Sequence, residues 1–300
     1  MAPIPHFGVT GFTTPAEVDN VLDSYMTPAF GNPLHGGRKL MVGVLVNEET
    51  LNGKPSSVWP ERYPPVERVA SIFEAAVKKT QHGSNEFWPE RGLGPVYDLR
   101  PRTLRFIHFH TYQPQLPAQL DRLLDIGGAY LNGIQLNIVN PPPHELRTWK
   151  KHHAARKLRL VIQVNRLMFR SYGNDPKTLC DALHKLYAGV MTDILFDLSG
   201  GEGVALDLQE TTAAVEMLFA RFGKTCGIGV AGGLNHGSVV SLAPLFKRFP
   251  TLSTDAESRI RDVFMDHEDK KRIVASSLSE LARYYLRNAF GILPITKRPD

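Results

Sequence analysis

The sequence predicts a (β/α)8 barrel, and three observations lead to this fold class. Eight short apolar, β-branched runs alternate along the chain with longer segments that have the apolar period of helices. The 300 residues suffice for eight such strand–helix pairs. No Pro- or Ser-rich linker divides the chain, so we expect one domain over residues 1–300. A doubly wound sheet remains the alternative, because alternation alone does not distinguish the two folds.

The predicted strands are rich in β-branched and apolar residues and are bounded by turn residues. They span residues 7–12, 39–47, 104–111, 133–138, 159–165, 193–199, 226–232 and, with the weakest pattern, 250–256.

The predicted helices begin at capping residues, and several end at Gly. The first has Thr14 as N-cap, Pro15 at the first helical position and Glu17 in the capping-box position. The others span residues 64–79, 116–128, 142–154, 175–189, 208–223 and 269–291.

Two long irregular stretches interrupt this order and are predicted to be insertions. Residues 48–64 follow a strand and would overhang the active face of a barrel, whereas residues 81–102 follow a helix and would lie at the opposite end. We expect the second stretch to serve structure or partner contact.

Composition indicates an ordinary globular protein, with 42% hydrophobic and 22% charged residues. No apolar run approaches the roughly 20 residues of a membrane span, and the N-terminus has no basic region followed by an apolar stretch. Two cysteines, Cys180 and Cys226, are too few for a disulfide framework or a thiolate metal cage. We expect a reduced, cytoplasmic protein with no membrane partner.

The net charge of +5 suits an anionic ligand but does not require one. The densest basic run, residues 150–159, joins a predicted helix to a predicted strand with only Trp149 beside it. Nucleic-acid binding usually needs a broader basic face with stacking aromatics. We therefore interpret the run as solvated surface, and an RNA-associated protein is the less favoured alternative.

Polar residues gather near the carboxyl ends of several predicted strands, where barrels place their active sites. Amides there suit a polar, hydroxyl-rich ligand, because they donate and accept without the desolvation cost of a charge. Each residue alone could instead end its strand in a turn or pair with a charge. The residues are Thr10, His108, His110, Gln135, Asn137, Gln163, Asn165 and Asp197.

His108 and His110 have the H-x-H spacing of some metal sites, yet nothing singles out a third ligand among Glu48, Asp197 and Glu257. Neither a G-x-S-x-G elbow nor a G-x-x-x-x-G-K-[ST] loop occurs. The G-x-G-x-x-G at residues 227–232 lies inside a predicted strand rather than after one, so it predicts no dinucleotide. We expect no metal and no other cofactor.

Several motifs, taken in order, resemble the phosphoribosylanthranilate isomerase family of tryptophan biosynthesis. "VGVLVN" at 42–47, "GIQLN" at 133–137, "FDLSGGEGVALD" at 196–207 and "VAGGLNHGSV" at 230–239 are similar to the family's strand ends. "GVTGFTTPAEV" at 8–18 is similar to the family's opening, and "STDAESRIRD" at 253–262 is a looser echo of its last motif. The matches span nearly the whole chain, as expected for a divergent member.

The resemblance implies that a phosphate is held by the loops after strands seven and eight. Glycine there permits positive φ and close approach of the backbone to an anion, as the general chemistry of such loops requires. The residues implied are Gly200, Gly201, Gly203, Gly232, Gly233 and Ser258.

The resemblance also implies an Amadori rearrangement, with Asp197 in the position of the family's acid and Thr10 in that of its basic Cys. A threonine hydroxyl is too weakly acidic to serve as a base near neutral pH. We expect His110 to supply the second group, because an imidazole titrates near neutrality.

We therefore expect an enzyme that acts on a phosphoribosyl-bearing small metabolite, by isomerisation or by a lyase or hydrolase step at the anomeric carbon. The alternative is a non-catalytic barrel that binds a phosphorylated metabolite. A homodimer is compatible with either.

Overall fold

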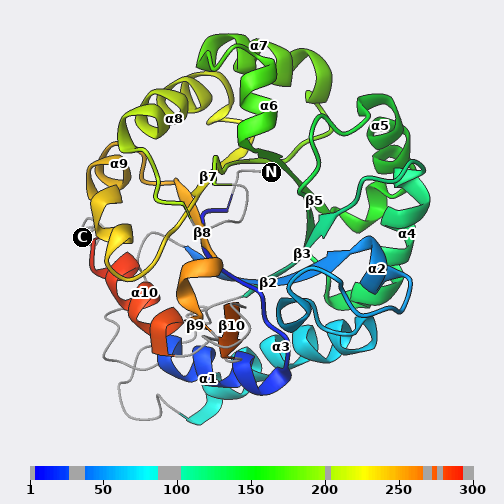
Figure 1. The fold of residues 1–300 in the computed structure, drawn as a ribbon, viewed down its shortest axis with the longest axis vertical. Helices are drawn as coiled ribbons and strands as arrows, with labels where there is room; N and C mark the ends of the chain where they lie inside the picture. Colours follow the sequence, from blue (N-terminus) through cyan, green and yellow to red (C-terminus); the bar gives the residue numbers. More distant parts are fainter. Residues whose placement is uncertain are drawn as a thin grey trace.

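A closed barrel of eight parallel strands forms the centre of the molecule. The computed structural model describes residues 4–26, 38–86, 103–199, 204–265, 272–275 and 280–292. The strands pair in sequence order, and β1 closes the barrel by pairing with both β2 and β8. The predicted (β/α)8 barrel is confirmed, and closure of the sheet excludes the doubly wound alternative. Figure 1 looks along the barrel axis, with the helices arranged around the strands.

The eight barrel strands overlap all eight predicted ones. They are β1 (His6–Thr10), β2 (Lys39–Asn47), β3 (Leu104–His110), β4 (Gly133–Leu136), β5 (Arg159–Val164), β6 (Asp193–Phe196), β7 (Gly227–Ala231) and β8 (Ser253–Ala256). Several end earlier than predicted, because the polar residues at their carboxyl ends leave the sheet for the loops. Asn137 and Asp197 each make one last backbone bond to the preceding strand, to Phe109 and Val164.

The helices pack outside the barrel, and five of the seven predicted ones begin within one residue of the predicted start. At the start of the first helix, Thr14 Oγ1 accepts from the Glu17 N–H at 3.3 Å and Glu17 Oε2 accepts from the Thr14 N–H at 3.2 Å, which confirms the capping box. The helices are α1 (Pro15–Met26), α2 (Glu48–Leu51), α3 (Val69–Glu86), α4 (Leu116–Gly127), α5 (Pro143–His152), α6 (Arg166–Ser171), α7 (Pro176–Tyr187), α8 (Leu208–Phe222), α9 (Ala243–Arg248) and α10 (Glu280–Gly291). Single-turn 3-10 helices include η2 (Pro60–Arg62), η3 (Val66–Arg68), η4 (Gly128–Tyr130), η5 (Ala154–Arg156), η6 (Ser238–Leu242) and η7 (Ser258–Ile260).

Three predictions of secondary structure were wrong in part. The predicted helix over residues 64–79 is α-helical only from Val69, after η3. The predicted helix over residues 269–291 begins only at Glu280, because Arg272–Ala275 forms β10, paired antiparallel with β9 (Asp262–Met265). Its β-branched centre, Ile273 and Val274, favours a strand. Residues 81–86 continue α3 rather than starting a loop, and the rest of the predicted 81–102 insertion lies outside the described residues.

Alternate strand residues face the helices or the barrel interior, as the two-residue period requires. The middle of the interior is apolar and contains Met41, Leu104, Phe106, Val161, Leu195 and Ala231. At the amino ends of the strands, the partly buried Arg159 forms an ion pair with the buried Asp193. A Cβ on Gly227 would lie 2.0 Å from Asp193 Oδ1, so this glycine of the G-x-G-x-x-G makes room for an ion pair.

Within the described ranges, no helix is both long and apolar enough to cross a membrane.

Candidate functional site

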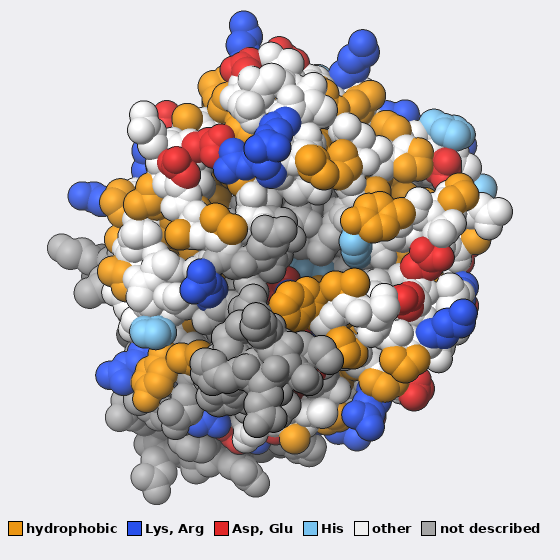
Figure 2. All heavy atoms as spheres, viewed as in Figure 1, with side chains coloured by type: hydrophobic (Ala, Val, Ile, Leu, Met, Phe, Trp, Pro, Cys, Tyr) orange, Lys and Arg blue, Asp and Glu red, His pale blue; other side chains and the backbone are white. Residues whose placement is uncertain are grey.

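A layer of buried polar side chains lies at the carboxyl ends of the barrel strands. Every member is at most 6% exposed: Thr10, His108, Gln135, Gln163, Asp197 and Asp255. Most were predicted, but Asp255 on β8 was not. Figure 2, viewed as in Figure 1, shows a hollow at the centre of this face with histidine and acidic atoms inside it. In (β/α)8 enzymes the catalytic groups occupy this end of the barrel.

Asp255 is the centre of a hydrogen-bonded group that joins three strands. Thr10 Oγ1 donates to Asp255 Oδ1 at 2.8 Å. His108 Nε2 lies 3.5 Å from the same Thr10 oxygen, and His108 Nδ1 lies 3.7 Å from Asp255 Oδ2. Thr10 is thus a donor to a carboxylate, rather than the proton acceptor that its position in the motif would imply.

Burial sets the protonation of this group. It raises the pKa of Asp255 to about 7, with the charge of Asp197 adding to the effect and the Thr10 hydrogen bond opposing it. Burial also lowers the pKa of His108 to about 3, with a contribution from the charge of His6. Near neutral pH, His108 is therefore uncharged and Asp255 is divided between its protonated and ionised forms.

The neutral imidazole has a preferred tautomer. The Thr10 hydroxyl hydrogen is used on Asp255, so His108 Nε2 can interact with Thr10 Oγ1 only as a donor. His108 Nδ1 is then the acceptor that faces Asp255 Oδ2. A proton on Asp255 Oδ2 would point toward that nitrogen.

Two glycines make room for the Asp255 group. A Cβ on Gly8 would lie 2.5 Å from Asp255 Oδ1, and a Cβ on Gly43 would lie 2.2 Å from Thr10 Oγ1. Both glycines lie on the interior side of neighbouring strands. The side chains of Thr10 and Asp255 therefore occupy space that a larger residue at position 8 or 43 would fill.

Asp197 is the second buried carboxylate of the layer, and among the described residues three donors hold it in place. Gln163 Nε2 donates to Oδ2 at 2.7 Å, while the Ser199 N–H and hydroxyl donate to Oδ1 at 3.0 and 2.6 Å. Asp255 pairs with Ala231 on β7, and Phe196 pairs with Val230, so Asp197 lies in the same row, two strands from Asp255. Two strand spacings separate their backbones by roughly 10 Å, with the small Ala231 between them.

The remaining predicted side chains lie around these carboxylates in different environments. Gln135 Nε2 donates to Asn137 Oδ1 at 2.9 Å. Asn165 Oδ1 accepts from the Met168 N–H at 2.9 Å and caps α6, which is the structural alternative that its strand-end position allowed. His110 is half-buried against Tyr112, with ring centroids 4.6 Å apart, and burial lowers its pKa.

The predicted phosphate loops are described in part. Gly200, Gly201 and Gly203 follow the sixth strand rather than the seventh or eighth, and they lie outside the described residues. Gly232 and Gly233 have φ values of 121° and 55°, the left-handed region that glycine tolerates. Among described residues, no backbone carbonyl accepts from their N–H groups. A Cβ on Gly232 would lie 3.5 Å from Asp197 Oδ1, which places this turn beside that carboxylate. Ser258 begins η7, three residues after Asp255.

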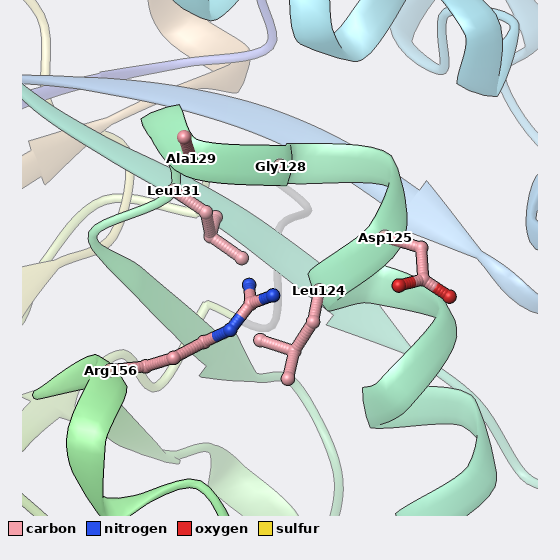
Figure 3. Close-up of a pocket in the computed structure, with 6 residues that line it drawn as sticks. All are labelled: Leu124, Asp125, Gly128, Ala129, Leu131 and Arg156. Carbon is pink, nitrogen blue, oxygen red and sulfur yellow. The ribbon is translucent and has the colours of Figure 1, made fainter.

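No described residues form a metal site: no group of three His, Cys, Asp or Glu side chains among them could hold an ion. A cavity of about 430 Å³ lies elsewhere, lined by Leu124, Asp125, Gly128, Ala129, Leu131 and Arg156. Figure 3 shows Arg156 reaching toward Leu124 and Leu131. These residues come from connections that precede β4 and β5, so the cavity is at the opposite end of the barrel from the carboxylates.

No protein-family model and no curated protein sequence matches this chain. Among solved structures, the octameric Rubisco of Pyrococcus horikoshii matches with a TM-score of 0.51 at 13% identity, over 97% of this chain and 59% of that chain. The dimeric archaeal Rubisco of Hyperthermus butylicus matches with a TM-score of 0.52 at 10% identity, over 97% and 60%. The tryptophan synthase A-subunit of Pyrococcus furiosus matches with a TM-score of 0.50 at 14% identity, over 97% and 98%.

The chain thus spans about three fifths of the Rubisco chains that it matches. At these identities the likeness shows the fold alone, and the phosphoribosylanthranilate isomerase-like motifs stay a prediction. This chain is an α/β protein of the (β/α)8 barrel fold, which it shares with Rubisco and the tryptophan synthase A-subunit.

Proposed function

We propose that this chain is an enzyme that performs acid–base chemistry of the isomerase type on a phosphoribosyl-bearing small metabolite. One observation carries the proposal: two buried carboxylates, Asp197 and Asp255, lie in one row at the carboxyl ends of β6 and β8, and Asp255 has a pKa of about 7. A group with a pKa near the working pH is well suited to take and return protons.

The two carboxylates differ in ways that suit different roles. An aldose-to-ketose isomerisation needs an acid that protonates the ring oxygen as the sugar opens. It also needs a base that takes the proton from C2 and returns it to C1, while the C2 hydroxyl proton passes to the heteroatom on C1. We assign Asp255 as the base, because burial raises its pKa to about 7 and its Oδ2 faces the neutral His108 Nδ1 at 3.7 Å, beyond hydrogen-bond distance. Asp197 would be the acid, as the motif resemblance implies, and Thr10 would orient Asp255.

Two observations support a phosphorylated substrate. Gly232 and Gly233 present N–H groups without a described backbone acceptor beside Asp197, and backbone N–H groups at such turns bind phosphate. Rubisco, which shares the fold, is named for ribulose-1,5-bisphosphate, a phosphorylated sugar. Gln135, Asn137 and Gln163 would contact the hydroxyl groups of the sugar, and His110 would line its entrance.

The basic run at residues 150–159 does not favour RNA as the ligand. Lys150 Nζ donates to the Val190 carbonyl, and Arg159 pairs with Asp193 inside the barrel. Two of its cations are therefore committed to the protein's own groups, which reduces the charge available for phosphates.

Proton exchange tests the proposal. Ribose 5-phosphate and its 1-amino derivatives would be incubated with the protein in D2O. NMR would follow exchange of the C2 proton, seen as its loss from the substrate and as deuterium at C1 of the ketose product. We expect Asp255→Asn and Asp197→Asn each to slow exchange by about 100-fold or more, while thermal shifts show that the ligand still binds. Asp125→Asn, at the opposite end of the barrel, is the matched control and should exchange normally.

Two results would contradict the proposal in different ways. A thermal shift without C2 exchange or bond cleavage in the wild type would leave a non-catalytic barrel that binds a phosphorylated metabolite. The absence of a shift with any phosphorylated sugar would refute the ligand class itself.

A further inference from the structure

Residues 57–63, which we term the strap, run along the mouth of the barrel from the β2 side to the β8 side. At one end, Asn47 Nδ2 donates to Ser56 Oγ at 2.7 Å, and Ser56 Oγ donates to the Val58 carbonyl at 2.7 Å. At the other end, Arg62 forms an ion pair with Glu257, whose side chain is 18% exposed. Glu257 follows β8 directly, so the strap links loops on either side of β1.

Arg261 lies close to the strap with its hydrogen-bonding capacity unused. Its side chain is 1% exposed, and its guanidinium lies against Gly11, where a Cβ would be 3.1 Å from Nη2. Among described residues, no acceptor lies within hydrogen-bond distance of its Nε, Nη1 or Nη2 atoms. The nearest carboxylate oxygen, Glu17 Oε1, is 3.8 Å from Nη1.

Glu61, on the strap, supplies the matching acceptor. Its Oε1 atom is also buried and, in the described part of the chain, has no donor. The charge of Glu61 opposes the lowering of the Arg261 pKa by burial, so the two groups are within electrostatic reach of each other. A buried donor and a buried acceptor that both lack partners are costly, and a movement that joined them would be favoured.

We infer that the strap is a lid with two positions. In the position seen here, the Arg62–Glu257 ion pair holds it; in the closed position, the Glu61 carboxylate accepts hydrogen bonds from Arg261. Arg261 lies on Gly11, the residue after Thr10, so closure brings the strap toward the Thr10–Asp255 pair. This inference rests on the proposed function in one respect, which is the purpose of closure. Closure of the strap would exclude water from Asp255 once a ligand is bound.

The two positions can be separated without any ligand. Spin labels on V58C, which replaces an exposed strap residue, and K177C, on α7, report the distance across the barrel by double electron–electron resonance. The natural Cys180 and Cys226 are buried and should stay unlabelled. We expect Glu257→Gln to release the strap and add a second distance to the distribution. Glu67→Gln, at an exposed position of η3, is the matched control and should not.

The contact that defines the closed position is tested by a second substitution. Adding Glu61→Gln to Glu257→Gln should remove at least nine tenths of the second population, because the carboxylate that Arg261 would bind is gone. A distribution in Glu257→Gln identical to that of the Glu67→Gln control would overturn the inference. Persistence of the second distance in the double variant would overturn it equally.

A ligand arm distinguishes the lid from the proposed function. Ribose 5-phosphate should raise the closed population about 10-fold in the labelled parent and should not do so in Glu61→Gln. A parent that binds ribose 5-phosphate by thermal shift while its distances stay unchanged would overturn the inference. A parent that shows no thermal shift contradicts the proposed function alone. The ligand-free distances of the variants then test whether the strap has two positions.

Discussion

Replacement of Thr10 by valine should raise the pKa of Asp255 by about one unit. Valine has nearly the shape of threonine, and Gly43 leaves room beside this side chain, so the change removes the hydroxyl with little repacking. That hydroxyl donates to Asp255 Oδ1 at 2.8 Å and lowers the pKa of Asp255 against the larger effect of burial.

The magnitude follows from the two protonation states. A hydrogen bond to an ionised carboxylate contributes about 1.5–3 kcal/mol, and one to a neutral group about 0.5–1.5 kcal/mol. The Thr10 bond therefore favours the ionised form of Asp255 by about 1–1.5 kcal/mol, which is about one pKa unit. The pKa of about 7 in the wild type should become about 8 in Thr10→Val.

The assay is a pH titration of carboxyl-labelled aspartate by carbon-13 NMR, with the Asp255 resonance assigned from Asp255→Asn. Thr254→Val is the matched control, since Thr254 is also buried but its hydroxyl contacts Tyr285 at 2.7 Å. The control should leave the Asp255 titration unchanged. An unchanged or lower pKa in Thr10→Val would refute the reasoning, because it would mean that the hydroxyl does not stabilise the charged form.

Three further predictions concern stability and can be measured by urea unfolding. Burial raises the pKa of Asp255 from 3.8 to about 7, so the folded state binds the extra proton, and stability should fall as pH rises from about 4 to about 7. Asp255→Asn lacks this loss, so its free energy of unfolding should rise by up to about 4 kcal/mol relative to that of the wild type between pH 4 and pH 8. A difference in stability that does not change with pH would contradict the assignment. Gly43→Ala should destabilise by about 1–3 kcal/mol, because its Cβ would lie 2.2 Å from Thr10 Oγ1, whereas Gly291→Ala has open space and should not. Arg159→Met leaves the buried Asp193 carboxylate without its ion-pair partner and should lower stability by about 3–5 kcal/mol. The control Arg248→Met removes an ion pair whose arginine is 60% exposed and should lower stability by less than about 1 kcal/mol. Equal losses of stability would show that burial does not govern these pairs.

Local patterns in the sequence predict most of the scaffold. The continuous apolar, β-branched run "KLMVGVLVN" locates β2 to the residue, and the Thr14–Pro15–Glu17 pattern locates the start of α1. Both depend on interactions within a few residues, so no tertiary information is needed. The predicted helix over residues 269–291 fails at its amino end, where Arg272–Ala275 is a strand that pairs with Asp262–Met265. The helical period of this segment does not reveal that pairing.

The candidate site divides in the same way. The sequence predicts that the site lies at the strand ends, because a polar residue at the end of an apolar strand is visible without a structure. The residues predicted in this way include Thr10, His108, Gln163 and Asp197. Asp255 was missed because "STDA" is short and lacks an apolar pattern; its one signal was a carboxylate inside a candidate strand. Its partner on β1 is 245 residues away, and only closure of the barrel between β8 and β1 brings the two together. The sequence by itself determined the fold and the ring of polar residues. The tertiary structure decided which carboxylate can exchange a proton near neutral pH, because the pKa of Asp255 depends on its burial in the closed barrel.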